Sequence, residues 1–181
     1  MPRIPQIDPQ TAVGQTGELL QSVQESLGAV PNFVRVLANS PAALNGFLGL
    51  FSIAHDGALD PLTRERIALA VAEQNACQYC VSAHTALGRK AGLDNDEMLA
   101  NRGGTSADAK ATAALAFTRA LVENTGDVTG AEFDAVRAAG HSDGEIVEII
   151  AHVALNLFTN LIGKATQVEI DFPEVELRTA A

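Results

Sequence analysis

The chain has 181 residues, of which 47% are hydrophobic, so it is long enough to form one domain with a sizeable core. Its 12 basic and 22 acidic residues give a net charge of −10 with no basic cluster, which argues against a nucleic-acid partner. No apolar run spans a bilayer without charged or polar interruption, and residues 1–5 lack the apolar core of a secretion signal. We therefore expect a cytoplasmic protein without a membrane partner.

The positions of proline, glycine and capping residues along the chain are typical of a helical protein. Residues 1–15 are proline-rich and predict an irregular arm. Helices are then predicted at about Thr16–Gly28, Pro31–Ala38, Ser40–Gly57, Asp60–Asn75, Cys77–Gly92, Asn95–Asn101 and Ala107–Asn124, followed by two that begin at the capping boxes of Thr129 and Ser142, the last reaching Val168. No segment alternates like a strand, so the sequence predicts an all-α helical bundle that forms a single domain over residues 1–181.

The most informative motif holds both cysteines of the chain, Cys77 and Cys80, with His84 four residues later. In a helix these offsets place all three side chains on one face. In the reducing cytoplasm such a pair is more often catalytic or metal-binding than a structural disulfide. An imidazole that takes a proton from one thiol, beside a second thiol, is the minimum needed for thiol redox chemistry.

The two cysteines differ in their predicted positions on this helix. Cys80 belongs to an inward stripe with His84, Leu87 and Ala91, while Ser82 is expected on another face. Cys77 is expected at or just before the first turn, where free backbone N–H groups and the helix dipole favour a thiolate. We also expect Cys77 to be nearer solvent, where a reductant can reach it.

A carboxylate on the preceding helix completes the candidate site. Glu65 lies on an apolar stripe, where an unpaired charge is costly, and a hairpin would bring it close to His84. Cys80, His84 and Glu65 then form a proton relay in which the carboxylate orients the imidazole. Glu73 is the competing acid, but a surface ion pair with Arg66 explains it, and we favour Glu65.

Alternatives remain for these residues. A zinc ion would have Cys77, Cys80 and His84 as ligands, with Glu65, Glu73 or water as the fourth. Alternatively, the two cysteines are only buried residues of the core. On the last helix, the polar stripe of His152, Asn156 and Asn160 is better explained by packing hydrogen bonds than by a cavity wall or a subunit interface. His55 and His141 are interpreted as capping or surface residues.

The spacing of Glu65, Cys77, Cys80 and His84 resembles the alkylhydroperoxidase D-like core of the carboxymuconolactone decarboxylase superfamily. The segments Asn156–Asn160 and Glu169–Pro173 are similar to its peroxidase-related branch. The resemblance covers most of the chain from about residue 20, with the redox core at about 41–125. The founding peroxidase type has a histidine between its cysteines, where this chain has Tyr79.

The resemblance implies an all-α, alkylhydroperoxidase D-like homo-oligomer, trimer-based, that reduces a hydroperoxide without a cofactor. In that family the second cysteine attacks the peroxide and the first resolves it, which assigns these roles to Cys80 and Cys77, with His84 and Glu65 as the relay. A dithiol, lipoyl or thioredoxin-like, would restore the thiols. The alternative is a non-redox member: a zinc- or small-molecule-binding oligomer, or an enzyme of the lactone-decarboxylase branch, which lacks the cysteine pair.

Overall fold

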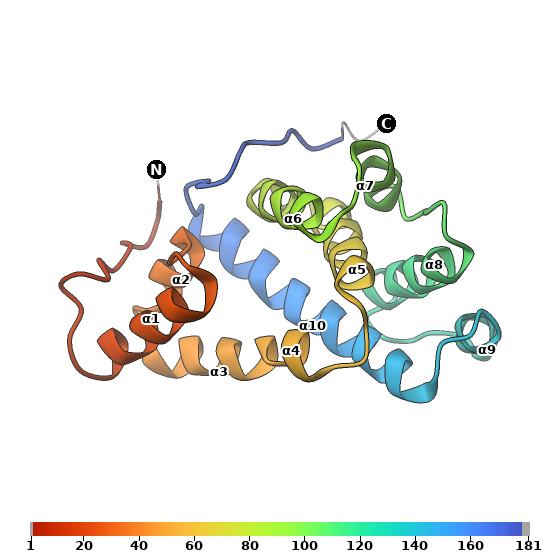
Figure 1. The fold of residues 1–181 in the computed structure, drawn as a ribbon, viewed down its shortest axis with the longest axis horizontal. Coiled ribbons are helices and arrows are strands. Elements are labelled where there is room, and N and C mark those ends of the chain that lie inside the picture. Colours follow the sequence, from red (N-terminus) through yellow and green to blue (C-terminus); the bar gives the residue numbers. More distant parts are fainter. Residues whose placement is uncertain (1, 179–181) are drawn as a thin grey trace.

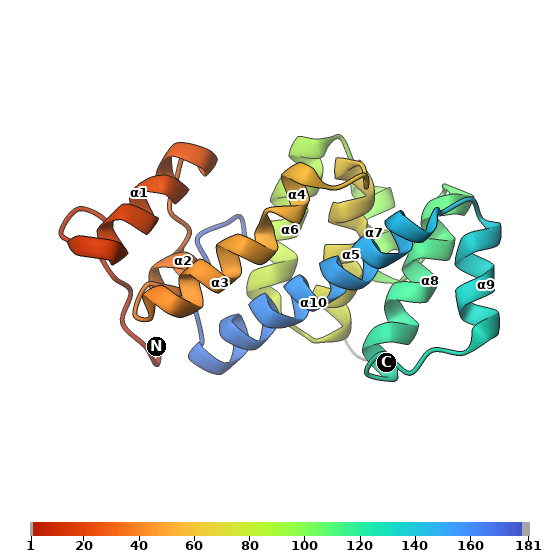
Figure 2. The ribbon, with the colours of Figure 1, turned by 90° about the horizontal axis from the view of Figure 1, so that it is seen from below.

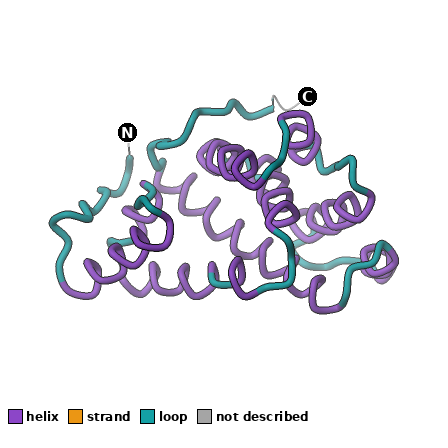
Figure 3. Tube along the Cα trace, in the orientation of Figure 1, coloured by secondary structure: helices purple, strands orange, loops and turns teal. Residues whose placement is uncertain are grey.

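The computed structural model describes residues 2–178, which form helices and loops with no strand (Figures 1 and 3). The predicted all-α class is therefore confirmed. The helices are α1 (Gly14–Leu27), α2 (Asn32–Leu37), α3 (Pro41–Phe51), α4 (Ile53–Asp56), α5 (Pro61–Gln74), α6 (Gln78–Ala91), α7 (Asn95–Arg102), α8 (Ala109–Glu123), α9 (Gly130–Ala138) and α10 (Asp143–Thr166).

Most helix starts follow the predicted capping residues. Ser40 and Asp60 cap α3 and α5 with a proline next in the chain, and Thr129 and Ser142 form complete capping boxes at α9 and α10. The helix predicted from Ser40 to Gly57 is instead divided at Ser52, whose hydroxyl donates to the Gly49 carbonyl at 3.0 Å. Such a local side-chain bond competes with the regular helical ladder.

Helix α10 runs obliquely through the molecule, with α1–α3 beside its carboxyl-terminal half and α8 and α9 beside its amino-terminal half (Figures 1 and 2). Ile146, Ile149 and Val153 join one apolar core with α5 and α8, and Leu155 joins a second core with α1–α3. Among the described residues, α10 alone is long and apolar enough to cross a membrane, with mean hydropathy 1.6, but 44% of that window is buried inside the fold. A core helix of a globular protein has this same character.

The candidate site residues are positioned by the hairpin of α5 and α6, which pack side by side. The turn between them needs a left-handed residue, Ala76 (φ 51°), and the Cys77 amide then donates back to the Ala72 carbonyl at 2.9 Å. Helix α10 lies along α5 in the same direction: Glu148 binds the Leu59 amide near the start of α5, and Asn160 binds Asn75 at its end. Both ends of α5 are thus tied to α10.

Both terminal segments pack against the helices. The predicted arm reaches α1 at Gly14, and its Arg3 amide donates to the Thr166 carbonyl at 2.8 Å. Residues 167–178 extend across α6 (Figure 1), where the Val175 amide donates to Ser82 Oγ at 3.0 Å. Because this segment covers a second face of α6, Ser82 is fully buried, whereas Leu87, predicted to point inward, is 41% exposed.

Candidate redox site

Cys77 and Cys80 are joined as a disulfide, with their Cα atoms 5.3 Å apart. Cys77 is the N-cap of α6, as predicted, and its sulfur accepts a hydrogen bond from the Cys80 amide at 3.4 Å. Cys77 is 1% exposed and Cys80 3% exposed. The expectation that Cys77 lies nearer solvent is therefore wrong, because both sulfurs face inward toward α10.

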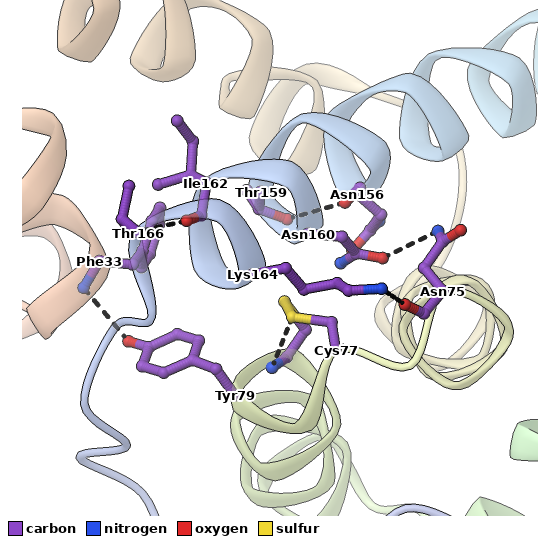
Figure 4. The surroundings of a disulfide bond; sticks show 11 residues. Phe33, Asn75, Cys77, Tyr79, Asn156, Thr159, Asn160, Ile162, Lys164 and Thr166 are labelled. Atoms are coloured by element: carbon purple, nitrogen blue, oxygen red, sulfur yellow. Dashed lines mark hydrogen bonds between the residues drawn. A yellow bond between two sulfur atoms is a disulfide. The ribbon is translucent and has the colours of Figure 1, made fainter. Parts of the chain in front are cut away.

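Gly163 allows this close approach of α10 to the disulfide. A Cβ atom at this position would lie 3.2 Å from Cys77 Sγ and 3.8 Å from Cys80 Sγ. Figure 4 shows the same stretch of α10, with Asn160 and Lys164 beside the turn that carries Cys77. Sequence analysis did not identify Gly163, although a glycine among the large side chains near the end of an otherwise apolar helix is the signal that indicates a close contact.

The predicted contact between Glu65 and His84 is present: His84 Nδ1 lies 2.8 Å from Glu65 Oε2. The contact exists because the α5–α6 hairpin brings Glu65 against the second and third turns of α6, where a Cβ at Gly88 would lie 3.8 Å from Glu65 Cβ. The side chains of His84 and Glu65 are 22% and 20% exposed. The candidate site thus meets solvent at the relay pair, while the sulfurs lie deeper.

Glu73 is engaged elsewhere, but not by the predicted partner. Its carboxylate pairs with Arg102 at 2.5 Å and accepts the Arg178 amide at 2.7 Å. Arg66 pairs instead with Glu97 on α7 at 2.9 Å. The Glu73 and Arg102 side chains are only 11% and 9% exposed, so this is a buried pair that joins α5 to α7 and to the carboxyl-terminal segment, not a surface pair.

The polar stripe of α10 is buried and only partly satisfied. Asn156 Nδ2 donates to the His152 carbonyl at 2.8 Å, and Asn160 Oδ1 accepts from Asn75 Nδ2 at 3.0 Å, so part of the stripe serves packing as predicted. However, His152 Nε2 and Asn160 Nδ2 are buried and have no partner among residues 2–178. Leaving such groups unpaired is costly, which marks both for a role beyond packing.

His152 is held neutral by its surroundings. Burial lowers the pKa of this imidazole to about 4, and the nearby positive charge of Arg64 acts in the same direction. The negative charges of Glu148 and Glu65 act in the opposite direction and raise this pKa, whereas His84 lowers it further. Sequence analysis placed His152 on the correct face of α10 but did not bring it near the relay.

Tyr79, between the cysteines, points away from the sulfurs. Its hydroxyl donates to Asp171 Oδ1 at 2.9 Å and so anchors the carboxyl-terminal segment to α6. Burial, with the charge of Asp171, raises the pKa of this phenol, so it remains a neutral hydrogen-bond donor. Tyr79 therefore has a structural role, in which it anchors the carboxyl-terminal segment.

The remaining predicted residues have simpler environments. His55 is exposed at the end of α4, as expected. His141 is 3% exposed, and its Nε2 lies 3.1 Å from the Lys110 carbonyl, so the expectation of a surface position is wrong. Within residues 2–178, no three His, Cys, Asp or Glu side chains are arranged to hold a metal ion, and the zinc alternative has no geometric support.

Comparison with known proteins places this geometry in context. The chain aligns with a peroxidase-related protein from Ralstonia eutropha JMP134, described as an alkylhydroperoxidase AhpD core, at 26% identity and a TM-score of 0.81, covering 94% of this chain and 92% of the other. A peroxidase-related protein from Silicibacter sp. TM1040 matches at 25% identity and a TM-score of 0.79, covering 93% and 91%. The debrominase Bmp8, solved with 2,3,4-tribromopyrrole, shares the fold at 22% identity and a TM-score of 0.78, covering 93% and 91%.

Sequence comparison identifies the family. Uncharacterized protein 4 in the cox locus of Paracoccus denitrificans is 36% identical over 56 residues, which span 30% of this chain and only half of that protein. The profile of the Carboxymuconolactone decarboxylase family matches residues 25–123, a stretch that includes the relay pair and both cysteines. Since this match extends over more than half of the chain and the fold is that of AhpD-like proteins, the chain belongs to the carboxymuconolactone decarboxylase family.

Proposed function

We propose that this chain reduces hydroperoxides through its cysteine pair. The observation that carries the proposal is the 2.8 Å contact between Glu65 and His84, one helical turn from a Cys77–Cys80 disulfide. A carboxylate that orients an imidazole next to a thiol is the arrangement that activates a thiol nucleophile. The peroxidase-related names of two structural relatives agree with this function.

In the first step, the Cys80 thiolate attacks the terminal oxygen of the hydroperoxide. An S–O bond forms while the O–O bond breaks, and the departing alkoxide takes a proton from His84, which had accepted the Cys80 proton. The products are an alcohol and a sulfenic acid on Cys80. Glu65 stabilises the imidazolium between the two proton transfers, because its carboxylate contacts His84 Nδ1.

In the second step, the Cys77 thiol attacks the Cys80 sulfur. The S–S bond forms, the S–O bond breaks, and the oxygen leaves as water with the remaining protons. A dithiol reductant then returns two electrons and two protons and becomes a disulfide itself. Because Cys77 is only 1% and Cys80 only 3% exposed, a slender lipoyl dithiol suits the site better than the broad surface of a thioredoxin-like protein. A cytoplasmic location would supply either reductant.

The test is steady-state turnover of hydrogen peroxide and an organic hydroperoxide, with lipoyl and thioredoxin systems supplied separately. Cys77→Ser is expected to react once and to accumulate a sulfenic acid on Cys80, detected by mass spectrometry with a sulfenic-acid trap. Cys80→Ser is expected to show almost no reaction. Labelling of Cys77 in Cys80→Ser, at a rate that matches the other variant, would exchange the two roles.

The non-redox alternatives are tested by the variant that lacks both thiols. Decarboxylation of a lactone acid needs no cysteine pair, so a decarboxylase activity that survives Cys77→Ser with Cys80→Ser would replace the peroxidase proposal. Peroxide turnover that is absent in the wild-type protein with every reductant would also overturn it.

A further inference from the structure

Asn160 is a buried polar side chain of α10 that lies three residues before the glycine that touches the disulfide. Gly163, three residues later, brings its backbone against the sulfurs of Cys77 and Cys80. Residues three apart on a helix share a face and lie one turn apart. Asn160 is 2% exposed, so its amide is shielded from solvent, as are the two cysteines.

The orientation of the Asn160 amide is set by Asn75. The amide oxygen of Asn160 accepts a hydrogen bond from Asn75 Nδ2 at 3.0 Å. In Figure 4 the oxygen points to Asn75 and the amide nitrogen points away from it, toward the side of the view that contains the Cys77 sulfur. This nitrogen is a buried donor without a partner among residues 2–178.

The surrounding contacts hold this donor in place. Lys164 Nζ donates to the Asn75 carbonyl, so Asn75 is bound by α10 through both its side chain and its backbone. Asn75 lies two residues before Cys77, and the intervening Ala76 has φ 51°. Movement of Cys77 relative to Asn160 is therefore restricted by a short and doubly tied segment.

We propose that Asn160 is a positioning residue of the redox pair, whose free amide N–H stabilises the Cys77 sulfur as a thiolate when the disulfide is open. The importance of this role rests on the proposed redox function. The Cys77 sulfur already accepts the Cys80 amide at the amino terminus of α6, which supplies one donor and the positive end of the helix dipole. Asn160 adds a donor from a different helix, in a buried place where hydrogen bonds to charge are strong.

This arrangement favours the reduced state of the pair. A disulfide sulfur is uncharged and a weak acceptor, whereas a thiolate carries a full negative charge, so the Asn160 donor gains more when the S–S bond is open. Opening consumes two electrons and two protons from a dithiol, and one proton is lost again to solvent as Cys77 ionises. The buried donor therefore lowers the pKa of Cys77 and makes the disulfide easier to reduce.

The decisive variant is Asn160→Leu, which removes the N–H donor without adding a charge. In the Cys80→Ser background, the pKa of Cys77 is read from thiolate absorbance at 240 nm during a pH titration. We expect Asn160→Leu to raise this pKa by about one unit or more, since a hydrogen bond to a charged group is typically worth this much. With both cysteines present, the equilibrium with dithiothreitol should shift toward the disulfide by about tenfold.

Asn156→Leu is the matched control, because Asn156 is 4% exposed on the same stripe but its amide nitrogen already donates to the His152 carbonyl. It should change the Cys77 pKa much less. An unchanged pKa in Asn160→Leu, or an equal change in both variants, would overturn the proposal. Where Asn160→Leu fails to fold, Asn160→Ser keeps a small donor and should give an intermediate pKa; a pKa equal to that of the parent also overturns it.

The titration uses no peroxide, which separates the two proposals. A shifted Cys77 pKa in a protein that turns over no hydroperoxide would refute the peroxidase function and leave the role of Asn160 intact. An unshifted Cys77 pKa in an active peroxidase would refute the role of Asn160 and leave the peroxidase function intact.

Discussion

Glu65 and Glu73 lie on the same helix, and the difference between them is decided by their partners. Glu65 contacts a partly exposed imidazole, whereas Glu73 neutralises the buried Arg102. A carboxylate that is already paired with a guanidinium has little capacity to orient a histidine. The choice of Glu65 for the relay remains a prediction that kinetics can test.

The relay predicts unequal effects of three substitutions. Glu65→Gln and His84→Ala should each slow the single-turnover reaction with peroxide by about tenfold or more, because general-base assistance is lost. Glu73→Gln should keep its rate but lose about 3 kcal/mol of unfolding free energy, because Arg102 is left buried without its counter-charge. Stopped-flow kinetics and urea unfolding measure the two effects. A slower reaction in Glu73→Gln than in Glu65→Gln would move the carboxylate role to Glu73.

His152 predicts a pH dependence of stability. Its pKa is lowered in the folded protein to about 4 from an ordinary 6.5, so the unfolded chain binds more protons between these values. The contribution of neutral His152 to the free energy of unfolding should therefore be fully present above pH 6.5. It should fall as the pH drops toward 4, by an amount on the order of 3 kcal/mol. Hydrogen-bonded carboxylates such as Glu97, with a pKa of about 2, lose their contribution only at lower pH.

Urea unfolding of His152→Gln as a function of pH checks this expectation. The variant should lose the slope between pH 6.5 and 4, while His55→Gln, at an exposed histidine, should keep it. If the slope survives in His152→Gln, another group is responsible for it.

At the scale of the elements, α10 approaches the disulfide at the start of α6 through a glycine, Gly163. Gly163→Ala should destabilise the oxidised protein by about 1–3 kcal/mol, because the new methyl group would lie 3.2 Å from Cys77 Sγ in a closely packed site. Reduced protein should be affected less, since free thiols can rotate away. Urea unfolding of both redox forms measures the difference.

Gly46→Ala provides the control for helix propensity. Gly46 lies in α3, and a Cβ there would meet no atom within 4 Å. Replacement should therefore be neutral or stabilising by up to about 1 kcal/mol in both redox forms. An equal gain in Gly163→Ala would show that α10 does not press on the disulfide.

At the scale of the whole molecule, α10 carries apolar side chains that the fold leaves uncovered. Val147, Ile150 and Leu161 are 64%, 39% and 68% exposed and follow one another at helical spacings along its outer side. An apolar helix face of this length is typical of a subunit interface. The expected homo-oligomer, trimer-based by resemblance, therefore remains our prediction.

Leu161→Glu should weaken this assembly, because a charge would be buried at the interface. Light scattering at micromolar concentration should give an oligomer for the wild type and a smaller species for the variant. Val13→Glu, at a residue that is 84% exposed and outside α10, should leave the mass unchanged. A monomeric wild-type protein would remove the prediction.

The sequence by itself determined the features that depend on short spacings. The all-α class, the capping boxes at Thr129 and Ser142, and the position of Cys77 as N-cap follow from residues three or four apart. The Glu65–His84 contact was also predictable, because a tight hairpin relates residues on consecutive helices by simple counting.

Only the tertiary structure decided which distant segments cover the site. The bond between Asn75 and Asn160 joins residues 85 apart, and that between Arg178 and Glu73 joins residues 105 apart. The burial of Cys77, the partner of Glu73 and the inward position of Ser82 all follow from such contacts. Local periodicity specifies the faces of a helix, but the docking of all helices together determines which face is covered and by what.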